Sequence, residues 1–430
     1  MLAARENVIE NRDVTASHAG NHAGGYACAV QRLRLSNFRN YGQLALDLSA
    51  SVVVLSGANG AGKTNMMEAI SFLSPGRGLR RARLRDVQKT DVQGSDGPES
   101  DVRGSDGQNT NVAPTANAGW AVAATVLGPG GAVKIGSSLS QTEKGTDRRV
   151  ARLDGQTVSP ASLSGVIGVQ WLTPQMDRLF QDGPSSRRRF LDRLVLGLDP
   201  DHGRRVGAYE RSLRERAKLL RQGAGNRSNI KAADTAWLSA LESRMAADGV
   251  AVAAARREAL ARLQHLLADT PGHFPRPGLA IQGQLEDWLE DLPAVEVESR
   301  FMTLLASNRR RDGEAGGTSA GPHRSDLAVH HMDKDQPAAA CSTGEQKALL
   351  ISVILANARA EAQRRGAAPI LLLDEVTAHL DRQRRQALFD EILALGGQAW
   401  LSGTDRELFE GLSGGAQFVS VDSGNAVLEG

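Results

Sequence analysis

The sequence has little of several residue types that mark whole classes of protein. Its 430 residues include only two cysteines, Cys28 and Cys341, too few for a disulfide framework or a multi-cysteine zinc site. No apolar run approaches the roughly 18 to 20 residues that span a bilayer, and residues 1–25 lack the apolar segment of a secretory signal. We therefore expect a cytoplasmic protein without a membrane partner.

Charge of one sign is also lacking. Fifty-one Lys and Arg residues stand against 49 Asp and Glu, which gives a formal net charge of +2. This balance offers no global argument for a nucleic-acid partner, so any DNA-binding surface must be local. The hydrophobic fraction of 41% and the charged fraction of 23% are typical of globular proteins.

The chain divides into segments of different texture. Residues 1–29 are polar and aperiodic, which predicts a disordered extension. Residues 86–118 are of low complexity, with DVQGSDG repeated as DVRGSDG, which predicts an exposed acidic loop. Alternating apolar residues between 30 and 184 predict strands and hairpins. One hairpin is expected from the alternation at 33–35 and 44–48, a second at the Gly-Pro-Gly-Gly turn 128–131, and a third at Asp154-Gly155. Residues 185–308 are rich in Arg, Ala and Leu and predict helices.

Residues 309–430 begin with a polar, Gly-rich stretch and then return to alternating strands and helices. We therefore predict one α/β lobe built from residues 30–184 and 309–430, with a smaller helical lobe, 185–308, inserted between them. Two apolar stripes in the inserted segment are too short and broken for a long coiled coil. They consist of Trp237, Leu241 and Met245, and of Leu260, Leu263 and Leu267.

A phosphate-binding motif follows the β-branched run at residues 52–56. The sequence from residue 57 to 64 fits G-x-x-x-x-G-K-[ST] at every fixed position, between a predicted strand and a predicted helix. Its backbone N–H groups can surround a phosphate, Lys63 can reach the β- and γ-phosphates, and the Thr64 hydroxyl can bind Mg²⁺. The predicted ATP-binding residues are Gly57, Ala58, Asn59, Gly60, Ala61, Gly62, Lys63 and Thr64.

A second motif supplies the carboxylates of a nucleotide triphosphatase. The apolar residues 370–373 place Asp374 at the carboxyl end of a strand, where it can hold Mg²⁺. Glu375 then stands where it can orient or deprotonate the attacking water. We predict Lys63, Asp374 and Glu375 as the catalytic residues.

The sequence 342–347, STGEQK, has the form of the turn with which ATP-binding-cassette proteins cover the γ-phosphate of an opposite subunit. A simple helix cap, with Ser342 and Glu345 as a capping box, is the competing interpretation. The long separation from Lys63 exceeds what a transporter ATPase needs. An ATPase-coupled nuclease is the other alternative, disfavoured by the little chain that follows Asp381.

Several of these segments closely resemble the RecF family of DNA replication and repair proteins. The resemblance rests on LRLSNFRNY (33–41), GANGAGKTNMMEAISFLSPGRGLR (57–80), PQMDRLFQDGPSSRRRFLDR (174–193) and GPHRSDL (321–327). It implies an ABC-type protein with weak ATPase activity, which binds single- and double-stranded DNA in an ATP-dependent way. It further implies action at single-strand gaps, with RecR and RecO as partners, to help load a recombinase.

The same resemblance implies roles for residues outside the phosphate loop. Gln175 takes the place of a metal- and water-sensing glutamine, although the family more often has an acidic residue near this turn. Ser342 and Gly344 would contact the γ-phosphate of the second subunit in an ATP-dependent homodimer, and Asp381 would lie at the dimer seam. Thr404 replaces a transporter-type switch histidine, which predicts slow hydrolysis.

DNA contacts are expected in the helical segment. The segment from Arg187 to Lys231 contains thirteen basic residues and five acidic ones. Its candidates for phosphate contacts are Arg187, Arg188 and Arg189. Because this segment has no pattern of aromatic residues that suggests base stacking, we expect binding that is independent of base sequence and sensitive to salt.

Overall fold

The computed structural model describes residues 28–89, 119–128, 130–141, 145–224, 232–268 and 273–429. The predicted extension 1–29 and the predicted loop 86–118 lie almost entirely outside these residues. Regular structure extends slightly into both segments: Cys28 is buried, Ala29 begins the first strand, and Val87 is buried. Gln88 pairs with Phe38.

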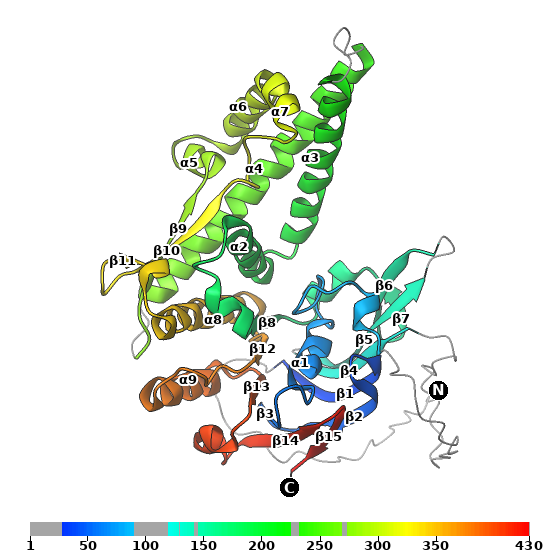
Figure 1. Ribbon diagram of the computed structural model, residues 1–430, viewed down its shortest axis with the longest axis vertical. Helices are drawn as coiled ribbons and strands as arrows, with labels where there is room; N and C mark the ends of the chain where they lie inside the picture. Colours follow the sequence, from blue (N-terminus) through cyan, green and yellow to red (C-terminus); the bar gives the residue numbers. More distant parts are fainter. Residues whose placement is uncertain are drawn as a thin grey trace, which may run out of the picture.

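A largely parallel sheet forms the centre of the lower half of the molecule (Figure 1). Neighbouring strands are parallel except at the β14–β15 edge. Consequently β3, β13 and β12 all end at the same edge of the sheet, where ligands bind in open α/β sheets. The order is β15 (Asn425–Leu428), β14 (Ala416–Asp422), β3 (Val52–Ser56), β13 (Ala399–Gly403), β12 (Ile370–Leu373) and β8 (Val169–Leu172).

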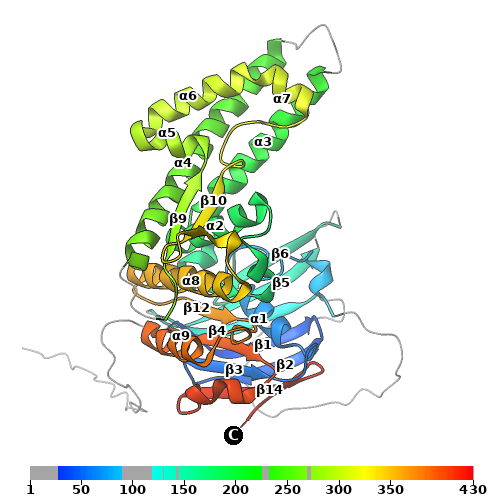
Figure 2. The ribbon, with the colours of Figure 1, turned by 60° about the vertical axis from the view of Figure 1, so that its left-hand side comes forward.

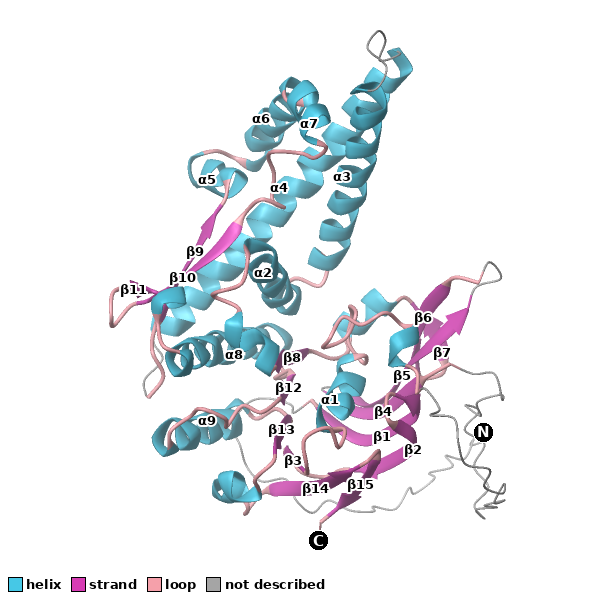
Figure 3. Ribbon diagram, viewed as in Figure 1, coloured by secondary structure: helices cyan, strands magenta, loops and turns pink. Residues whose placement is uncertain are grey.

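A second, antiparallel sheet lies beside it, and Figure 3 shows both in magenta. The predicted hairpins are confirmed: Leu33 and Leu35 face Leu46 and Leu44, and β4 turns into β5 at Gly128–Gly131. The third hairpin turns at Asp154-Gly155, where both residues have positive φ. The order is β2 (Tyr41–Asp47), β1 (Ala29–Phe38), β4 (Ala121–Gly128), β5 (Gly131–Gln141), β6 (Asp147–Leu153) and β7 (Gln156–Val158).

The inner strands β3, β13 and β12 are buried along their whole length, as expected for apolar strands of a parallel sheet covered on both faces. Val52 and Val54 pack on one side, with α2 (Pro184–Leu198), α8 (Thr343–Arg365) and α9 (Arg382–Leu395). The alternate residues Val53 and Leu55 pack on the other side, with α1 (Lys63–Ser71) and the antiparallel sheet. Short 3-10 turns at Pro160–Gly165, Pro174–Arg178 and Arg406–Leu412 connect these layers.

The upper half is formed mainly by helices, as Figure 2 shows from a second direction. They are α3 (His202–Ala224), α4 (Ala232–Ala268), α5 (Gln284–Asp291), α6 (Ala294–Ser307) and α7 (Arg309–Ala315). The 37 residues of α4 extend for about 55 Å at 1.5 Å per residue. Both predicted apolar stripes lie on this one helix and are buried, except for Trp237, which is 53% exposed.

A small third sheet was not predicted. It joins β9 (Pro277–Gln282), β10 (Asp326–His331) and β11 (Gln336–Pro337), with β10 in the middle. Residues 277–282 were included in the predicted helical segment because six residues are too few for the alternation of a strand to be recognised there. The predicted Gly-rich stretch at 309–321 likewise contains α7, which packs against α3.

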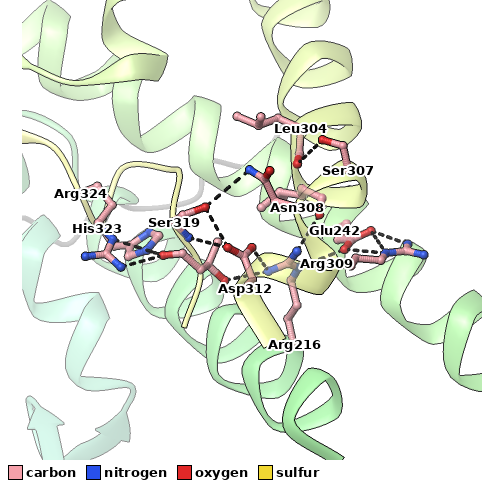
Figure 4. A network of polar contacts seen from close by, with 12 residues as sticks. Arg216, Glu242, Leu304, Ser307, Asn308, Arg309, Asp312, Ser319, His323 and Arg324 are labelled. Atoms are coloured by element: carbon pink, nitrogen blue, oxygen red, sulfur yellow. Dashed lines mark hydrogen bonds and ion pairs between the residues drawn. The ribbon is translucent and has the colours of Figure 1, made fainter. Parts of the chain in front are cut away.

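A buried ionic network holds α7 to α3 and α4 (Figure 4). The guanidinium of Arg216 on α3 is fully buried and bonds to Glu242 on α4 at 3.0 Å and to Asp312 on α7 at 2.7 Å. It also donates to Thr318 Oγ1 at 2.9 Å and to the Leu305 carbonyl at 2.6 Å. Because each buried charge has a partner, the network fixes how these helices pack.

The division into an α/β lobe and a helical lobe remains our proposal. The contacts of α7 with α3 favour extending the helical lobe beyond residue 308. Within the described ranges, no helix is both long and apolar enough to cross a membrane.

Candidate nucleotide site

The phosphate-binding loop connects β3 to α1 at the edge where the parallel strands end. Glycine is required at two of its positions by close contacts as well as by positive φ angles of 147° at Gly57 and 125° at Gly62. A Cβ atom on Gly57 would lie 2.2 Å from the carbonyl oxygen of Val421. On Gly62 it would lie 2.5 Å from Asn40 Nδ2.

The lysine of the motif is folded over its own loop. Lys63 Nζ donates hydrogen bonds to the carbonyl oxygens of Gly57 at 2.6 Å and Ala58 at 2.9 Å. Burial lowers the pKa of Lys63, and the nearby carboxylates of Glu375 and Asp374 partly offset that effect. The ammonium group therefore stands at the loop with two acidic neighbours.

Residues far apart in the sequence meet beside this loop. Thr64 Oγ1 lies 2.8 Å from Asp374 Oδ2 and donates a hydrogen bond to this carboxylate. Ser402 at the end of β13 donates to Asp374 Oδ1 at 2.6 Å and accepts the backbone N–H of Glu375 at 2.9 Å. The structure thus brings together the predicted residues Thr64, Asp374 and Glu375.

Ser402 was missed by the sequence analysis, which considered only Thr404 in this segment. The signal was available, because Ser402 closes a buried apolar strand that ends at the same edge as Asp374. Thr404 is exposed.

Glu375 has an unusual backbone conformation, with φ of 49°. Its carbonyl oxygen accepts a hydrogen bond at 2.9 Å from Lys347, a buried residue of α8. Lys347 also forms an ion pair at 3.7 Å with Asp177 in the turn Pro174–Arg178. Burial raises the pKa of Asp177 and lowers that of Lys347, and each charge opposes the shift of the other.

The turn that contains Asp177 also carries the predicted Gln175. This side chain is exposed, and within the described part of the chain it forms no hydrogen bond or ion pair with the phosphate loop. Asp177 is the residue of this turn that is linked, through Lys347, to Glu375. Asp177 lies two positions after Gln175, so an acidic residue of this turn, and not Gln175, is connected to the site.

The predicted γ-phosphate turn begins α8. Ser342 caps the helix, and its N–H and hydroxyl both donate to Glu345 Oε2, at 3.0 and 2.8 Å. The capping box weighed against the functional interpretation is therefore present. Ser342 remains exposed and Gly344 partly so, and the described residues show no contact between this turn and the chain's own phosphate loop.

Asp381 also caps a helix. Its carboxylate accepts the Arg384 N–H at 2.8 Å at the start of α9, and the residue is exposed. Its hydrogen bond lowers the pKa of Asp381. Its local role is structural, and its exposure leaves it accessible to a second molecule.

Residues of the segment 33–41, named above for its resemblance to the RecF family, form hydrogen bonds with the backbone of the phosphate loop. Asn40 Nδ2 and the Tyr41 hydroxyl donate to the carbonyls of Ala61 and Gly62, at 2.8 and 3.0 Å. Glu68, fully buried on α1, pairs with Arg39 at 2.8 Å and Arg80 at 3.1 Å. These contacts tie α1 to the first hairpin.

The loop after α1 is held by a buried arginine of β6. Arg149 donates to Ser137 Oγ at 2.6 Å and to the carbonyls of Gly76 at 2.7 Å and Ser74 at 2.9 Å. Burial lowers its pKa to about 10. This arrangement fixes the path of the exposed arginines that follow in the same loop.

The three predicted DNA-contact arginines differ in their surroundings. Arg187 forms a bidentate pair with Asp326 on β10, at 2.8 and 2.6 Å, and Arg188 donates to the Ser325 carbonyl at 2.8 Å. Only Arg189 of the three is exposed. Its charge, together with that of Arg77, contributes to the lowered pKa of Arg81, whose main cause is burial.

Comparison with known proteins relates most of the chain to one group. The family model described as the RecF/RecN/SMC N terminal domain matches residues 29–413. The DNA replication and repair protein RecF of Rhizobium meliloti (strain 1021) is 46% identical over 398 residues, covering 92% of this chain and 97% of its own. That of Mesorhizobium japonicum is also 46% identical over 398 residues, covering 92% of this chain and 96% of its own.

A solved structure shows the same fold. The recombination mediator protein RecF in the RecFOR pathway, solved with ATP, aligns with a TM-score of 0.77 at 19% identity. The alignment covers 96% of this chain and all of the other. The mixed α/β fold with a P-loop ATPase lobe, predicted from the sequence, is confirmed.

Proposed function

The chain belongs to the RecF family of DNA replication and repair proteins, and on that basis we propose that it is an ATP-gated DNA clamp. The family assigns it a role in replication and repair, with DNA and ATP as ligands. The finer proposal is that it binds single-strand gaps as a dimer and helps to load a recombinase. RecR and RecO are the protein partners that the family resemblance implies.

One observation carries the nucleotide part of the proposal: the contact of Thr64 with Asp374, at 2.8 Å. A hydroxyl and a carboxylate are oxygen ligands suited to Mg²⁺, which takes few protein ligands and completes its shell with water and phosphate oxygens. The donor set therefore fits the ion. When bound, Mg²⁺ would neutralise charge on the β- and γ-phosphates.

The remaining residues have roles that follow from their positions. Lys63 would exchange its two carbonyl contacts in the loop for phosphate oxygens of ATP. Glu375 would orient or deprotonate the attacking water. Ser402 would keep the Asp374 carboxylate in a fixed direction, because its hydroxyl donates to Oδ1. We expect weak ATPase activity that times DNA binding and release.

The dimer is proposed because three of the expected ligands show no contact with the chain's own phosphate loop among the described residues. Ser342 and Gly344 are accessible at the start of α8, and Asp381 is accessible at the start of α9. We propose that they contact the γ-phosphate and the seam in a second copy of the chain. ATP would then be shared between two subunits and would hold them together.

We propose that the exposed arginines Arg77, Arg81 and Arg189 contact the DNA backbone. The positive charges of Arg77 and Arg189 both act on Arg81, with Glu210 and Asp192 as opposing charges. Among the described residues, none of these three arginines forms an ion pair with a carboxylate. Arg187 is less suitable because Asp326 holds its guanidinium. Such contacts predict affinity that falls with salt.

Fluorescence anisotropy on gapped DNA with Mg²⁺ tests this function. We expect tight binding with ATP, weak binding without it, and loss of the ATP effect in Lys63→Arg. Arg189→Ser should weaken binding and reduce the slope of log affinity against log salt by about one. Arg310→Ser, an exposed arginine on α7, is the matched control and should bind as the wild type does.

Three results would contradict the proposal. Affinity for gapped DNA that is the same with and without ATP would contradict an ATP-gated clamp. Cleavage of the gapped DNA would favour the alternative of an ATPase-coupled nuclease. ATP hydrolysis without any DNA response would instead favour the transporter-type alternative.

A further inference from the structure

Lys347 has a position that the sequence motif does not explain. Lys347 is the last residue of the predicted γ-phosphate turn, residues 342–347. Its side chain is only 3% exposed and points into its own subunit. Burying an ammonium group is costly unless it is paired and hydrogen-bonded. Among the described residues, Lys347 contacts the carbonyl oxygen of Glu375, at 2.9 Å, and the carboxylate of Asp177, at 3.7 Å.

The first partner is in a conformation that needs support. Glu375 has φ of 49°, in the left-handed region, which is strained for a residue other than glycine. Its N–H donates to Ser402 at 2.9 Å and its C=O accepts from Lys347. The backbone of this residue is therefore held from both sides, and the direction of its side chain follows from that backbone.

The second partner connects the same ammonium to a different element. Asp177 lies in the turn after β8, and Lys347 lies on α8, five residues after the exposed cap Ser342. One buried side chain thus joins the turn after β8, the helix that presents Ser342 and Gly344, and the residue after Asp374. A shift of α8 cannot leave the Glu375 backbone unaffected.

We infer that Lys347 is a positioning residue for ATP hydrolysis, which holds the Glu375 backbone and ties it to the position of α8. The inference rests on the proposed function, since it assigns Lys347 a part in the hydrolysis that Glu375 would perform. Lys347 acts through Glu375 and does not touch the nucleotide in this account. Contact of a second subunit with the start of α8 would then change the position of the Glu375 carboxylate, which would activate the water.

The test separates hydrolysis from binding. Lys347→Met removes the ammonium and keeps most of the side-chain volume. ATP affinity, ATP-dependent dimerisation and single-turnover hydrolysis per bound ATP are measured on the full chain with gapped DNA. We expect unchanged ATP affinity and hydrolysis roughly 10- to 100-fold slower, as for a misplaced catalytic group. Lys347→Arg, which keeps a donor and a charge, should recover part of the rate.

Two further variants keep the result interpretable. Arg364→Met removes a positive charge from the exposed far end of the same helix and should hydrolyse ATP at the wild-type rate. Lys347→Met alone leaves Asp177 without its counter-charge, so the double variant Lys347→Met, Asp177→Asn removes both charges of the pair. This double variant should fold even where the single one does not, and should remain slow.

The inference is overturned if Lys347→Met, or the double variant Lys347→Met, Asp177→Asn, is folded and hydrolyses bound ATP at the wild-type rate. Loss of ATP affinity in proportion to the loss of hydrolysis would also overturn it, because that pattern marks a purely structural lysine. Failure of the proposed function is recognised separately: the wild-type chain would then neither bind nor hydrolyse ATP, and both claims would be rejected together.

Discussion

At the scale of single residues, this protein buries charge in pairs and networks. Glu68 is fully buried against two arginines beside the phosphate loop, and Arg216 is fully buried against two carboxylates in the helical half. A buried pair need not add net stability, but removal of one partner leaves an uncompensated charge. These residues therefore fix how elements pack, and their loss should be costly.

Arg216→Met should destabilise the helical half by about 3–5 kcal/mol, because Asp312 would lose its buried partner and Glu242 would keep only Arg309. Urea unfolding followed by circular dichroism measures this change. Arg310→Met on α7 is the control, since Arg310 is 92% exposed and pairs only with Glu314. It should change stability by less than about 0.5 kcal/mol. Equal effects of the two variants would contradict the account.

A second residue-scale prediction concerns pH. The buried Tyr209 hydroxyl donates to His323 Nδ1 at 2.7 Å, and His323 Nε2–H donates to the Thr318 carbonyl at 3.0 Å, an assignment that requires a neutral imidazole. Burial, with smaller contributions from Arg324 and Arg188, lowers the pKa of His323 below its ordinary 6.5. The unfolded chain then binds more protons at mildly acidic pH, so stability falls as the pH drops below about 6.5.

The urea midpoint at pH 7.5 and at pH 5.5 measures this dependence. Wild type should lose more stability between these values than His323→Gln, whose amide does not titrate. The same loss in both proteins would show that other groups dominate the acid response.

At the scale of elements, the phosphate loop shows where packing limits the sequence. At Gly57 a Cβ atom would collide with the backbone oxygen of Val421, whereas at Gly60, also with positive φ, nothing lies within 4 Å. Gly57→Ala should therefore abolish binding of a fluorescent ATP analogue and lower the melting temperature. Gly60→Ala should retain most of the stability, since its cost is limited to about 1 kcal/mol of backbone strain. The reverse order of melting temperatures would contradict this geometry.

The elements that the sequence predicted well were those with a strong local pattern. The hairpins turning at Asp154-Gly155 and Gly128–Gly131, the apolar strands and the helix after Lys63 follow from turn residues and periodicity. β9 was missed because a short strand is recognised only with its partner β10, which lies far along the chain. α7 was missed because tertiary contacts of Asp312 stabilise a segment with unfavourable glycines.

The site followed the same rule. Thr64 and Asp374 were predicted because each belongs to a contiguous motif, and the structure brings them into contact. Ser402 and Lys347 were not predicted, because their importance depends on contacts with Glu375 across the fold. The different surroundings of Arg187 and Arg189 likewise depend on Asp326, which no local pattern identifies.

At the scale of the whole molecule, two ends of the chain complete one α/β sheet and a helical segment projects from it (Figure 1). The strands β3, β13 and β12 gather the phosphate loop, Ser402 and Asp374 at one edge. The starts of α8 and α9 leave Ser342 and Asp381 exposed. One chain therefore presents two different halves of the proposed nucleotide site, and two copies would complete it.

Light scattering of the full chain with Mg²⁺ and ATP tests this central claim most directly. We predict that the wild type doubles its mass with ATP and returns to a monomer without it. Ser342→Arg should stay monomeric while still binding a fluorescent ATP analogue, and Ser299→Arg, an exposed control on α6, should dimerise normally. A wild-type chain that remains monomeric under all conditions, or a Ser342→Arg variant that dimerises with ATP, would contradict the shared site.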